Sequence, residues 1–223
     1  MTTPQTIIGT AASENLIALN MHQSYIIKGR GGNDFIMGSF VNDELRGNAG
    51  NDVIYGLDGN DRIFGGRGND ALLGGNGQDI LKGRSGNDSL FGGADFDVLK
   101  GGRGNDYLNG GANSDMLKGG RGRDTLVGED GNDWLDGGRG NDRLTGGVGR
   151  DVFFLSFGND VIEDYSVNED AAIRIDDDVF GTDIAPTLSM SSEGLQIITD
   201  FGTTTLAGVD ISEFTIAQNI DIA

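Results

Sequence analysis

Aspartate recurs at a fixed interval of nine residues through more than half of the chain. Counted from Gly29 as position 1, fourteen nine-residue units run to Phe154 without an insertion or deletion, and each has Asp at position 6. Carboxylates are hard oxygen ligands, suited to the flexible shell of about six to eight oxygens around Ca²⁺, whereas Mg²⁺ needs tighter octahedral geometry. The candidate metal ligands of the odd units are Asp34, Asp52, Asp70, Asp88, Asp106, Asp124 and Asp142, and those of the even units are Asp43, Asp61, Asp79, Asp97, Asp115, Asp133 and Asp151.

The other positions of the unit predict the structure that holds these aspartates. Position 1 is always Gly and position 8 is always apolar, and position 4 is Gly except at Val41, Asp95 and Asn113. Positions 1 to 6 are turn material, and positions 7 to 9 form a short strand that points position 8 inward. Two units make one coil of the chain, so stacked coils form two facing parallel sheets. The pattern predicts an all-β, right-handed parallel β-roll.

Parallel stacking places like positions of successive coils about 4.8 Å apart. The odd aspartates then form one column and the even aspartates a second column on the opposite edge. Carboxylates at that separation repel unless a cation lies between them. In a single repeat, Asp could merely cap a tight turn, but fourteen identical units favour calcium sites, each completed one coil later. One buried apolar side chain per unit makes a thin core, so we expect metal binding to be part of folding.

Composition restricts the classes of partner. Thirty-five acidic and sixteen basic residues give a net charge of −19, which argues against nucleic acid as the partner and for cations. Because the chain has no Cys, disulfides and thiolate metal sites are excluded. No apolar run is long enough to predict a transmembrane segment, and the N-terminal residues lack the pattern of a standard signal peptide.

Two intact units, "GGRGNDYLN" at 101–109 and "GGRGNDRLT" at 137–145, carry a family resemblance. The pattern GGxGxDxUx resembles the RTX nonapeptide of secreted Gram-negative proteins, and the match extends over 29–154. The segment that begins "RDVFFLSFGND" resembles the cap of the RTX β-rolls in serralysin-type proteases and alginate epimerase modules. The resemblance implies calcium binding and type I secretion through an uncleaved C-terminal signal, to the outside of a Gram-negative cell.

The resemblance also implies a ligand set. One loop supplies the carbonyls of positions 2 and 4 and its Asp, and the next loop on the same edge supplies the carbonyls of positions 1 and 3 and its Asp. One such site would use Gly66, Gly68 and Asp70 with Gly83, Ser85 and Asp88, and an equivalent site would use Gly102, Gly104 and Asp106 with Gly119, Arg121 and Asp124. Seven loops on each edge allow up to about twelve ions. A degenerate fifteenth loop would add Asp160.

The three exceptions at position 4 all fall in even units. Asp95 and Asn113 tolerate a left-handed backbone, so their carbonyls can still act as calcium ligands. The β-branched Val41 does not tolerate that backbone. We therefore expect a complete odd edge and an even edge that is impaired near its N-terminal end.

The segments outside the units are expected to cap the solenoid. Residues 1–28 hold a degenerate repeat, "GTAASENLI", and are predicted to form the N-terminal cap. Residues 155–223 are predicted to form a C-terminal cap of alternating strands, including "AAIRID", "LQIITDF" and "TTTLAGVD", and to carry the secretion signal at the end, "NIDIA".

Catalytic motifs are missing from this sequence. His22 is the only histidine, which excludes HExxH and a histidine zinc triad, and no GxSxG motif occurs. A surface or cap role for His22 is the simpler interpretation. A glycosidase carboxylate pair is not formally excluded, but the abundant aspartates are assigned to metal. We predict that the chain is not an enzyme.

Position 9 carries the remaining signal. In the even units it places Lys82, Lys100 and Lys118 in one ladder, with Arg46 further toward the N-terminus. The ladder is either a solvated sheet face or a track for an acidic polysaccharide, as the resemblance to alginate epimerase modules suggests. The apolar residues at this position in odd units, such as Tyr55 and Phe91, suit partner contact or self-association.

Three functional hypotheses follow. The first is a non-catalytic extracellular binding module for acidic polysaccharide or a cell surface. The second is a structural, self-associating surface protein or secretion carrier. The third is the RTX module of a larger enzyme whose catalytic domain lies outside this chain.

Overall fold

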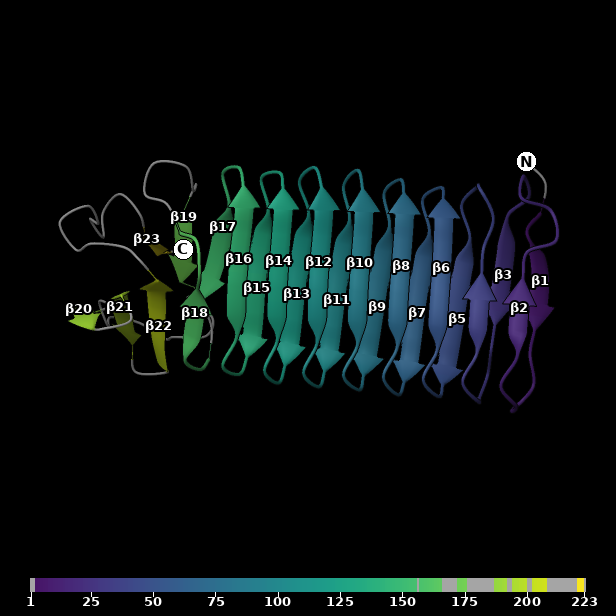
Figure 1. Ribbon diagram of the computed structural model, residues 1–223, viewed down its shortest axis with the longest axis horizontal. Coiled ribbons are helices and arrows are strands. Elements are labelled where there is room, and N and C mark those ends of the chain that lie inside the picture. The colour runs from purple at the N-terminus through teal and green to yellow at the C-terminus, as the bar shows by residue number, and fades with distance from the viewer. Residues whose placement is uncertain are drawn as a thin grey trace.

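The computed structural model describes residues 3–155, 157–165, 172–175, 187–191, 194–199, 202–207 and 220–222. These residues form an elongated solenoid in which strands stack side by side along the long axis (Figure 1). All the regular secondary structure in them is β, as predicted. The β-roll contains two sheets, and consecutive strands of the repeat array alternate between them.

The first sheet has eleven strands that pair in parallel in the order β1-β3-β5-β7-β9-β11-β13-β15-β17-β19-β23. We call it sheet A. Its strands are β1 (Gln5–Ile8), β3 (Tyr25–Lys28), β5 (Glu44–Ala49), β7 (Arg62–Arg67), β9 (Ile80–Ser85), β11 (Val98–Arg103), β13 (Met116–Arg121), β15 (Trp134–Arg139), β17 (Val152–Leu155), β19 (Ala172–Ile175) and β23 (Ile220–Ile222).

The second sheet, sheet B, has twelve strands in the order β2-β4-β6-β8-β10-β12-β14-β16-β18-β22-β21-β20. Its pairs are parallel as far as β22, and the last two pairs, β22–β21 and β21–β20, are antiparallel. Its strands are β2 (Asn15–Ile17), β4 (Phe35–Met37), β6 (Val53–Asp58), β8 (Ala71–Asn76), β10 (Ser89–Ala94), β12 (Tyr107–Ala112), β14 (Thr125–Asp130), β16 (Arg143–Val148), β18 (Asp160–Ile162), β20 (Thr187–Ser191), β21 (Gly194–Thr199) and β22 (Gly202–Ala207).

The core is the predicted column of position-8 side chains between the sheets. All fourteen, from Ile36 to Phe153, are at most 1% exposed. The column continues into both flanks, through Ile27 on the N-terminal side and Ile162 and Ile173 on the C-terminal side. The degenerate repeats of the flanks are therefore coils of the same solenoid, because they bury the same kind of side chain at the same place.

The strands are longer than the sequence predicts. Most contain six residues, positions 7 to 9 of one unit followed by positions 1 to 3 of the next, so the turn shrinks to positions 4 to 6. The pairing skips position 1 but resumes at positions 2 and 3, as in Gly93 with Gly111 and Ala94 with Ala112. Position 2 has a positive φ in most units, which kinks the strand without ending the ladder. The expectation of a six-residue turn was wrong for this reason.

The C-terminal strands β19, β21 and β22 coincide with the three alternating segments predicted there. Residues 208–219 and Ala223 lie outside the described residues, so of the predicted secretion signal only the strand β23 is described. The boundaries at 28/29 and 154/155 mark where the regular nine-residue register begins and ends. As domain limits they remain predictions.

Candidate metal centre

The aspartates of the repeat form the two predicted columns. Each Asp directly precedes a strand, the odd aspartates at sheet B and the even aspartates at sheet A. Because the strands pair in parallel with an offset of eighteen residues, every Asp lies next to the Asp of the following coil. All fourteen side chains are at most 5% exposed, and Asp160 extends the odd column at 1% exposed.

One oxygen of each carboxylate is tied to the neighbouring coil. The backbone amide of Asp70, for example, donates to Oδ1 of Asp88 at 2.8 Å, and that of Asp79 donates to Oδ1 of Asp97 at 2.7 Å. The same bond joins successive aspartates along both columns, up to Asp142 and Asp160 at 3.0 Å. These bonds fix the orientation of each carboxylate and leave its second oxygen directed into its own loop.

The second oxygen, Oδ2, is buried without a hydrogen bond in most of the column. This holds for Asp34, Asp52, Asp61, Asp70, Asp79, Asp88, Asp97, Asp106, Asp115, Asp124, Asp133 and Asp142. A buried charged acceptor that loses water without gaining a partner is costly, so an array of such oxygens fits the binding of cations along the columns.

Burial raises the pKa of these carboxyls. It raises the pKa of Asp61 and Asp97 to about 8, and the neighbouring aspartates of the column add repulsion in the same direction. The pKa of Asp124 rises to about 7 and that of Asp88 to about 6 for the same reasons. The amide hydrogen bond from the preceding coil lowers each pKa but does not offset burial. The charged columns are thus unfavourable by themselves, and a bound divalent cation would compensate the cost of burial and offset the repulsion between carboxylates.

The loop backbone has the geometry expected of the glycines. Gly66, Gly68, Gly102 and Gly104, predicted to supply carbonyls, have φ between 120° and 130°, a region open to glycine. At position 1 glycine is needed because a side chain would collide with the Asp carboxylate of the same loop. A Cβ on Gly83 would lie 2.2 Å from Oδ2 of Asp88, and Gly119 stands in the same relation to Asp124 at 2.4 Å.

Two predicted carbonyl ligands also serve the ladder between coils. The carbonyl of Ser85 accepts from the amide of Gly68 at 2.9 Å, and that of Arg121 accepts from the amide of Gly104 at 2.8 Å. A carbonyl has a second lone pair, so these bonds do not remove it as a ligand. Among the described residues, no three His, Asp or Glu side chains converge on one point. The implied site needs only two carboxylates, with backbone carbonyls for the rest.

Position 4 behaves as its residue types predict. Asp95 and Asn113 have φ of 75° and 74°, so both adopt the left-handed backbone in place of glycine. Val41 is outside the left-handed region, as expected for a β-branched residue. The structure thus confirms the local conformation expected at all three exceptions.

A second hydrogen-bond ladder at position 5 was missed in the sequence. Oδ1 of Asn69 accepts from the amide of Asn87, whose Oδ1 accepts from the amide of Asn105, each at 2.8 Å. Each Asn side chain of this ladder accepts from the amide of the following coil, whereas each Asp side chain accepts from the amide of the preceding coil. The ladder ends where Arg123 replaces Asn, and a second run joins Asn141, Asn159 and the amide of Thr203. The frequent Asn before the repeated Asp is the signal that could have identified it.

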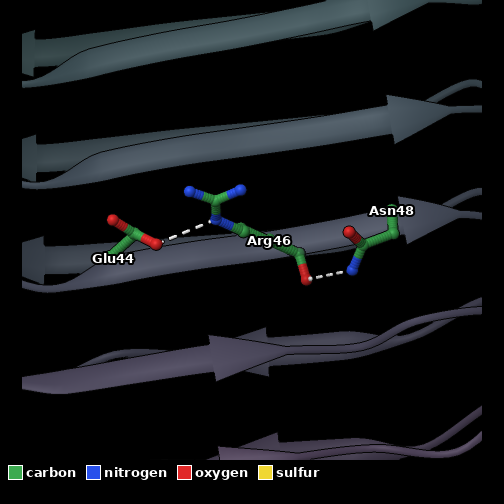
Figure 2. A network of polar contacts seen from close by, with 3 residues as sticks. All are labelled: Glu44, Arg46 and Asn48. Carbon is green, nitrogen blue, oxygen red and sulfur yellow. Dashed lines mark hydrogen bonds and ion pairs between the residues drawn. The ribbon is translucent and has the colours of Figure 1, made fainter. Parts of the chain in front are cut away.

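The lysine ladder lies on the outer face of sheet A, with Lys82, Lys100 and Lys118 in register on β9, β11 and β13. Lys82 lies 5.8 Å from the ring centroid of Phe64, and Lys118 pairs with Asp136 at 2.5 Å. Arg46 stacks over the other side of Phe64. Nε of Arg46 also donates to Oε1 of Glu44 at 2.9 Å on the same strand. The side-chain amide of Asn48 donates to the backbone carbonyl of Arg46 at 3.3 Å (Figure 2).

An exposed arginine column runs parallel to the lysines and was not recognised as a cationic feature in the sequence. Position 3 of the odd units places Arg103, Arg121 and Arg139 in register at the ends of β11, β13 and β15, with Arg67 further along beyond Ser85. Between the two columns lies position 2, which is mostly glycine. Here the surface forms grooves of about 570 Å³, lined by residues including Lys118 and Arg121, and about 340 Å³, lined by residues including Arg67 and Phe64. Cations on both sides and a glycine floor make this the cationic face of the molecule.

His22 lies in the N-terminal segment, exposed, with its ring 6.3 Å from that of Phe40. Its backbone amide donates to Asn20 at 3.1 Å. Within the described part of the chain, no helix is long and apolar enough to cross a membrane.

Comparison with known proteins agrees with the repeat. A family model described as the RTX calcium-binding nonapeptide repeat (4 copies) matches residues 26–45, 37–72, 64–99, 73–108, 91–126 and 127–162, which together cover 26–162. The search of curated proteins found no match.

Similar solved structures include an extracellular lipase and an epimerase subunit. The extracellular lipase LipA from Serratia marcescens aligns with a TM-score of 0.45 and 19% identity, covering 91% of this chain and 42% of the lipase chain. The AlgE6R3 subunit from the Azotobacter vinelandii mannuronan C5-epimerase aligns with a TM-score of 0.38 and 26% identity, covering 52% of this chain and 78% of that chain. The chain therefore spans less than half the length of the lipase.

Proposed function

Since this chain belongs to the RTX calcium-binding nonapeptide-repeat family, we propose that it is a secreted β-roll that folds as multiple Ca²⁺ ions bind between successive aspartates of each column. The observation that carries this proposal is the array of buried, unpartnered Oδ2 atoms along both columns. In the unfolded chain the carboxylates are hydrated and separated, whereas in the fold they are buried and adjacent. Calcium binding and folding are therefore coupled, because the cation stabilises the fold and the site exists only in the fold.

The residues fit the ion chemically. Each site would combine two carboxylates with turn carbonyls, an all-oxygen set that suits Ca²⁺. Gly66, Gly68 and Asp70 with Gly83, Ser85 and Asp88 would hold one ion, and the corresponding residues of other adjacent loops would hold the rest. Bound calcium supplies positive charge to the columns and removes the repulsion within them. The chain's own residues orient the carboxylates through the Asp amide ladder and exclude water through the core.

Millimolar calcium outside the cell would fold the protein, and the low calcium of the cytosol would keep it unfolded for export. This linkage supports type I secretion from a Gram-negative bacterium as part of the proposal.

For the folded protein we propose a non-catalytic role as a binding module for an acidic polysaccharide, on the cationic face of sheet A. Support comes from the exposed arginine column and the parallel lysine ladder, in which Lys100 and Lys118 are exposed and Lys82 is half-buried, on a molecule of net charge −19. Lys100, at the centre of the lysine ladder, is exposed and has no ion pair within the described residues. Coils repeat about every 4.8 Å, so the cations recur regularly along the axis and suit a linear polymer with one carboxylate per unit.

The alternative is a structural, self-associating role through the outer face of sheet B. The observation that favours it is the apolar character of that face, where Tyr55 packs 5.6 Å from Phe35 and Phe91 packs 5.7 Å from Tyr107. Phe91 and Tyr107 remain 38% and 36% exposed. Service as a module of a larger enzyme is compatible with either face.

A polyuronate binding assay tests the polysaccharide role. We expect wild type to bind in calcium and not in EGTA, and the triple variant Lys82→Ser, Lys100→Ser, Lys118→Ser to fold but lose binding. The matched control is Arg123→Ser, Arg143→Ser, Arg150→Ser, which removes three cations from outside the cationic face. Equal loss in both triple variants would indicate non-specific attraction. Calcium-dependent folding without polyuronate binding, together with concentration-dependent assembly, would favour the structural role.

A further inference from the structure

Asp43 differs from the aspartates whose Oδ2 is buried without a hydrogen bond, because residues of its own loop donate to its second oxygen. Oδ2 of Asp43 accepts from the backbone amide of Ser39 at 2.6 Å and from its hydroxyl at 2.9 Å. Oδ1 accepts from the backbone amide of Tyr25 at 2.5 Å. Both the carboxylate and Ser39 are buried, at 5% and 0% exposed. Three protein donors therefore satisfy both oxygens of this carboxylate.

The backbone of this loop also differs from the others. Position 2 has a positive φ in every unit except this one, where it is Ser39, and position 4 is Val41, which is also outside the left-handed region. The carbonyls of these two positions are the ones that the family resemblance assigns to the first half of a calcium site. In this loop neither residue has the conformation that the calcium-loop pattern uses.

The strand pairing changes at the same place. β4 ends at Met37, so its pairing with β6 stops at Met37 and Tyr55, whereas the pairing of β6 with β8 continues as far as Asp58 and Asn76. The amide of Phe40 instead donates to the carbonyl of Met21 at 2.7 Å, and the Phe40 ring contacts that of His22. Phe40 at the middle of the loop is thus docked on the N-terminal segment, while the ends of the loop keep their hydrogen bonds to the next coil, such as that from the Asn60 amide to Oδ1 of Asn42 at 2.9 Å.

At the N-terminal end of the odd column a carboxylate is likewise satisfied by a residue of its own loop. Glu14 takes the place of Asp in the degenerate repeat, and its amide donates to Oδ1 of Asp34 at 2.9 Å. Its carboxylate accepts from the backbone amide of Thr10 at 2.6 Å and from the Thr10 hydroxyl at 3.0 Å. A hydroxyl residue that follows the position-1 glycine satisfies the carboxylate in both loops.

We propose that loop 38–43 takes no calcium ion, because Ser39 occupies the place of the cation, and that the first coil is a metal-independent end of the array. This rests on the proposed function, since it concerns which of the candidate sites bind. The even column then binds one ion fewer than its intervals allow, because the interval between Asp43 and Asp61 is lost. The calcium-bound coils then stack on a first coil whose carboxylates are satisfied by hydrogen bonds from the protein alone.

The test is the number of calcium ions bound per chain, counted by native mass spectrometry and equilibrium dialysis, with circular dichroism confirming that each variant folds in calcium. Asp43→Asn keeps an acceptor for the Tyr25 amide and is expected to leave the ion count unchanged. The matched control, Asp79→Asn in a loop with complete geometry, is expected to lower it. The double variant Ser39→Gly, Val41→Gly restores glycine at positions 2 and 4 and is expected to bind one ion more than wild type.

The outcomes separate this proposal from the proposed function. Loss of an ion in Asp43→Asn together with no gain in the double variant would overturn the metal-independent loop while leaving calcium-driven folding intact. Absence of bound calcium from wild type and all variants would overturn the proposed function itself. If the double variant fails to fold, Asp43→Asn against Asp79→Asn still decides, because equal losses in the two contradict the proposal.

Discussion

Substituting Asp97 by Asn should change stability in opposite directions with and without calcium. Asp97 is fully buried, its Oδ2 has no hydrogen bond, and burial together with the neighbouring carboxylates raises its pKa to about 8. Asn keeps the size of the side chain and an oxygen that can accept from the amide of Asp79, but it carries no charge. Without metal at pH 9, where Asp97 is ionised, the variant removes an uncompensated charged acceptor, which is worth about 1–3 kcal/mol.

With calcium the same change removes a charged ligand from between two other aspartates of the even column. Removing one partner of a buried ion pair costs about 3–5 kcal/mol, so the calcium-bound variant should be less stable than wild type by a comparable amount. The assay is unfolding followed by circular dichroism, by urea in calcium and by titration of a folding osmolyte in EGTA.

The matched control is Asp136→Asn, a carboxylate on the outer face of sheet A that pairs with Lys118. It should change stability by less than about 1 kcal/mol in both media. If Asp97→Asn is destabilising in EGTA as well as in calcium, the carboxylate is a structural hydrogen-bond acceptor and the reasoning from the unpaired oxygen is refuted.

Three further predictions concern the columns and the turns. Because the pKa values of the buried aspartates are raised above the unfolded value of about 4, the metal-free fold binds more protons than the unfolded chain, so its stability falls as the pH rises from about 4 to about 8. Acidifying the protein from pH 8 to pH 5 in EGTA should therefore increase the β signal in circular dichroism, and a decrease would contradict this. Asn87→Ala removes the acceptor of the Asn105 amide and should cost about 1 kcal/mol in urea unfolding in calcium, whereas Asn76→Ala, which loses only an exposed side-chain bond to Asp58, should cost less. Leu57 occupies position 2 with φ of 89°, so Leu57→Gly should stabilise the calcium-bound protein by about 1 kcal/mol, and a lower melting temperature would show that its side-chain packing outweighs the strain.

The fold could be predicted from the sequence because the signals at separate positions agree. The apolar residue at position 8 indicated the core, and the invariant nine-residue spacing indicated the stacking of the aspartates. That Gly at position 1 leaves room for the Asp oxygen was found only in the structure. The strand length could not be predicted in this way. Glycine at positions 1 and 2 is typical of turns, yet parallel pairing with the next coil extends the strand through it, a tertiary effect that local propensity does not contain.

The sequence predicted which aspartates form the two columns, but not which loop departs from the pattern through its hydrogen bonds. Val41 pointed to an impaired loop, whereas the role of Ser39 depends on its hydroxyl and amide meeting Asp43 in the folded loop. The arginine column was missed for a similar reason. Arg67, Arg103 and Arg139 fell among the predicted turn positions, and Arg121 was considered only for its backbone carbonyl. Their common face with the lysines emerges once positions 1 to 3 are known to lie on the strand.

Calcium binding and folding measured on the same sample test the central claim most directly. Calcium would be titrated into the metal-free protein at pH 7.5 while bound ions are counted and the β signal is followed by circular dichroism. We expect little β structure in EGTA and a cooperative rise of the β signal that coincides with the binding of several ions per chain. A full β signal in EGTA with no bound ions, unchanged by calcium, would contradict the account.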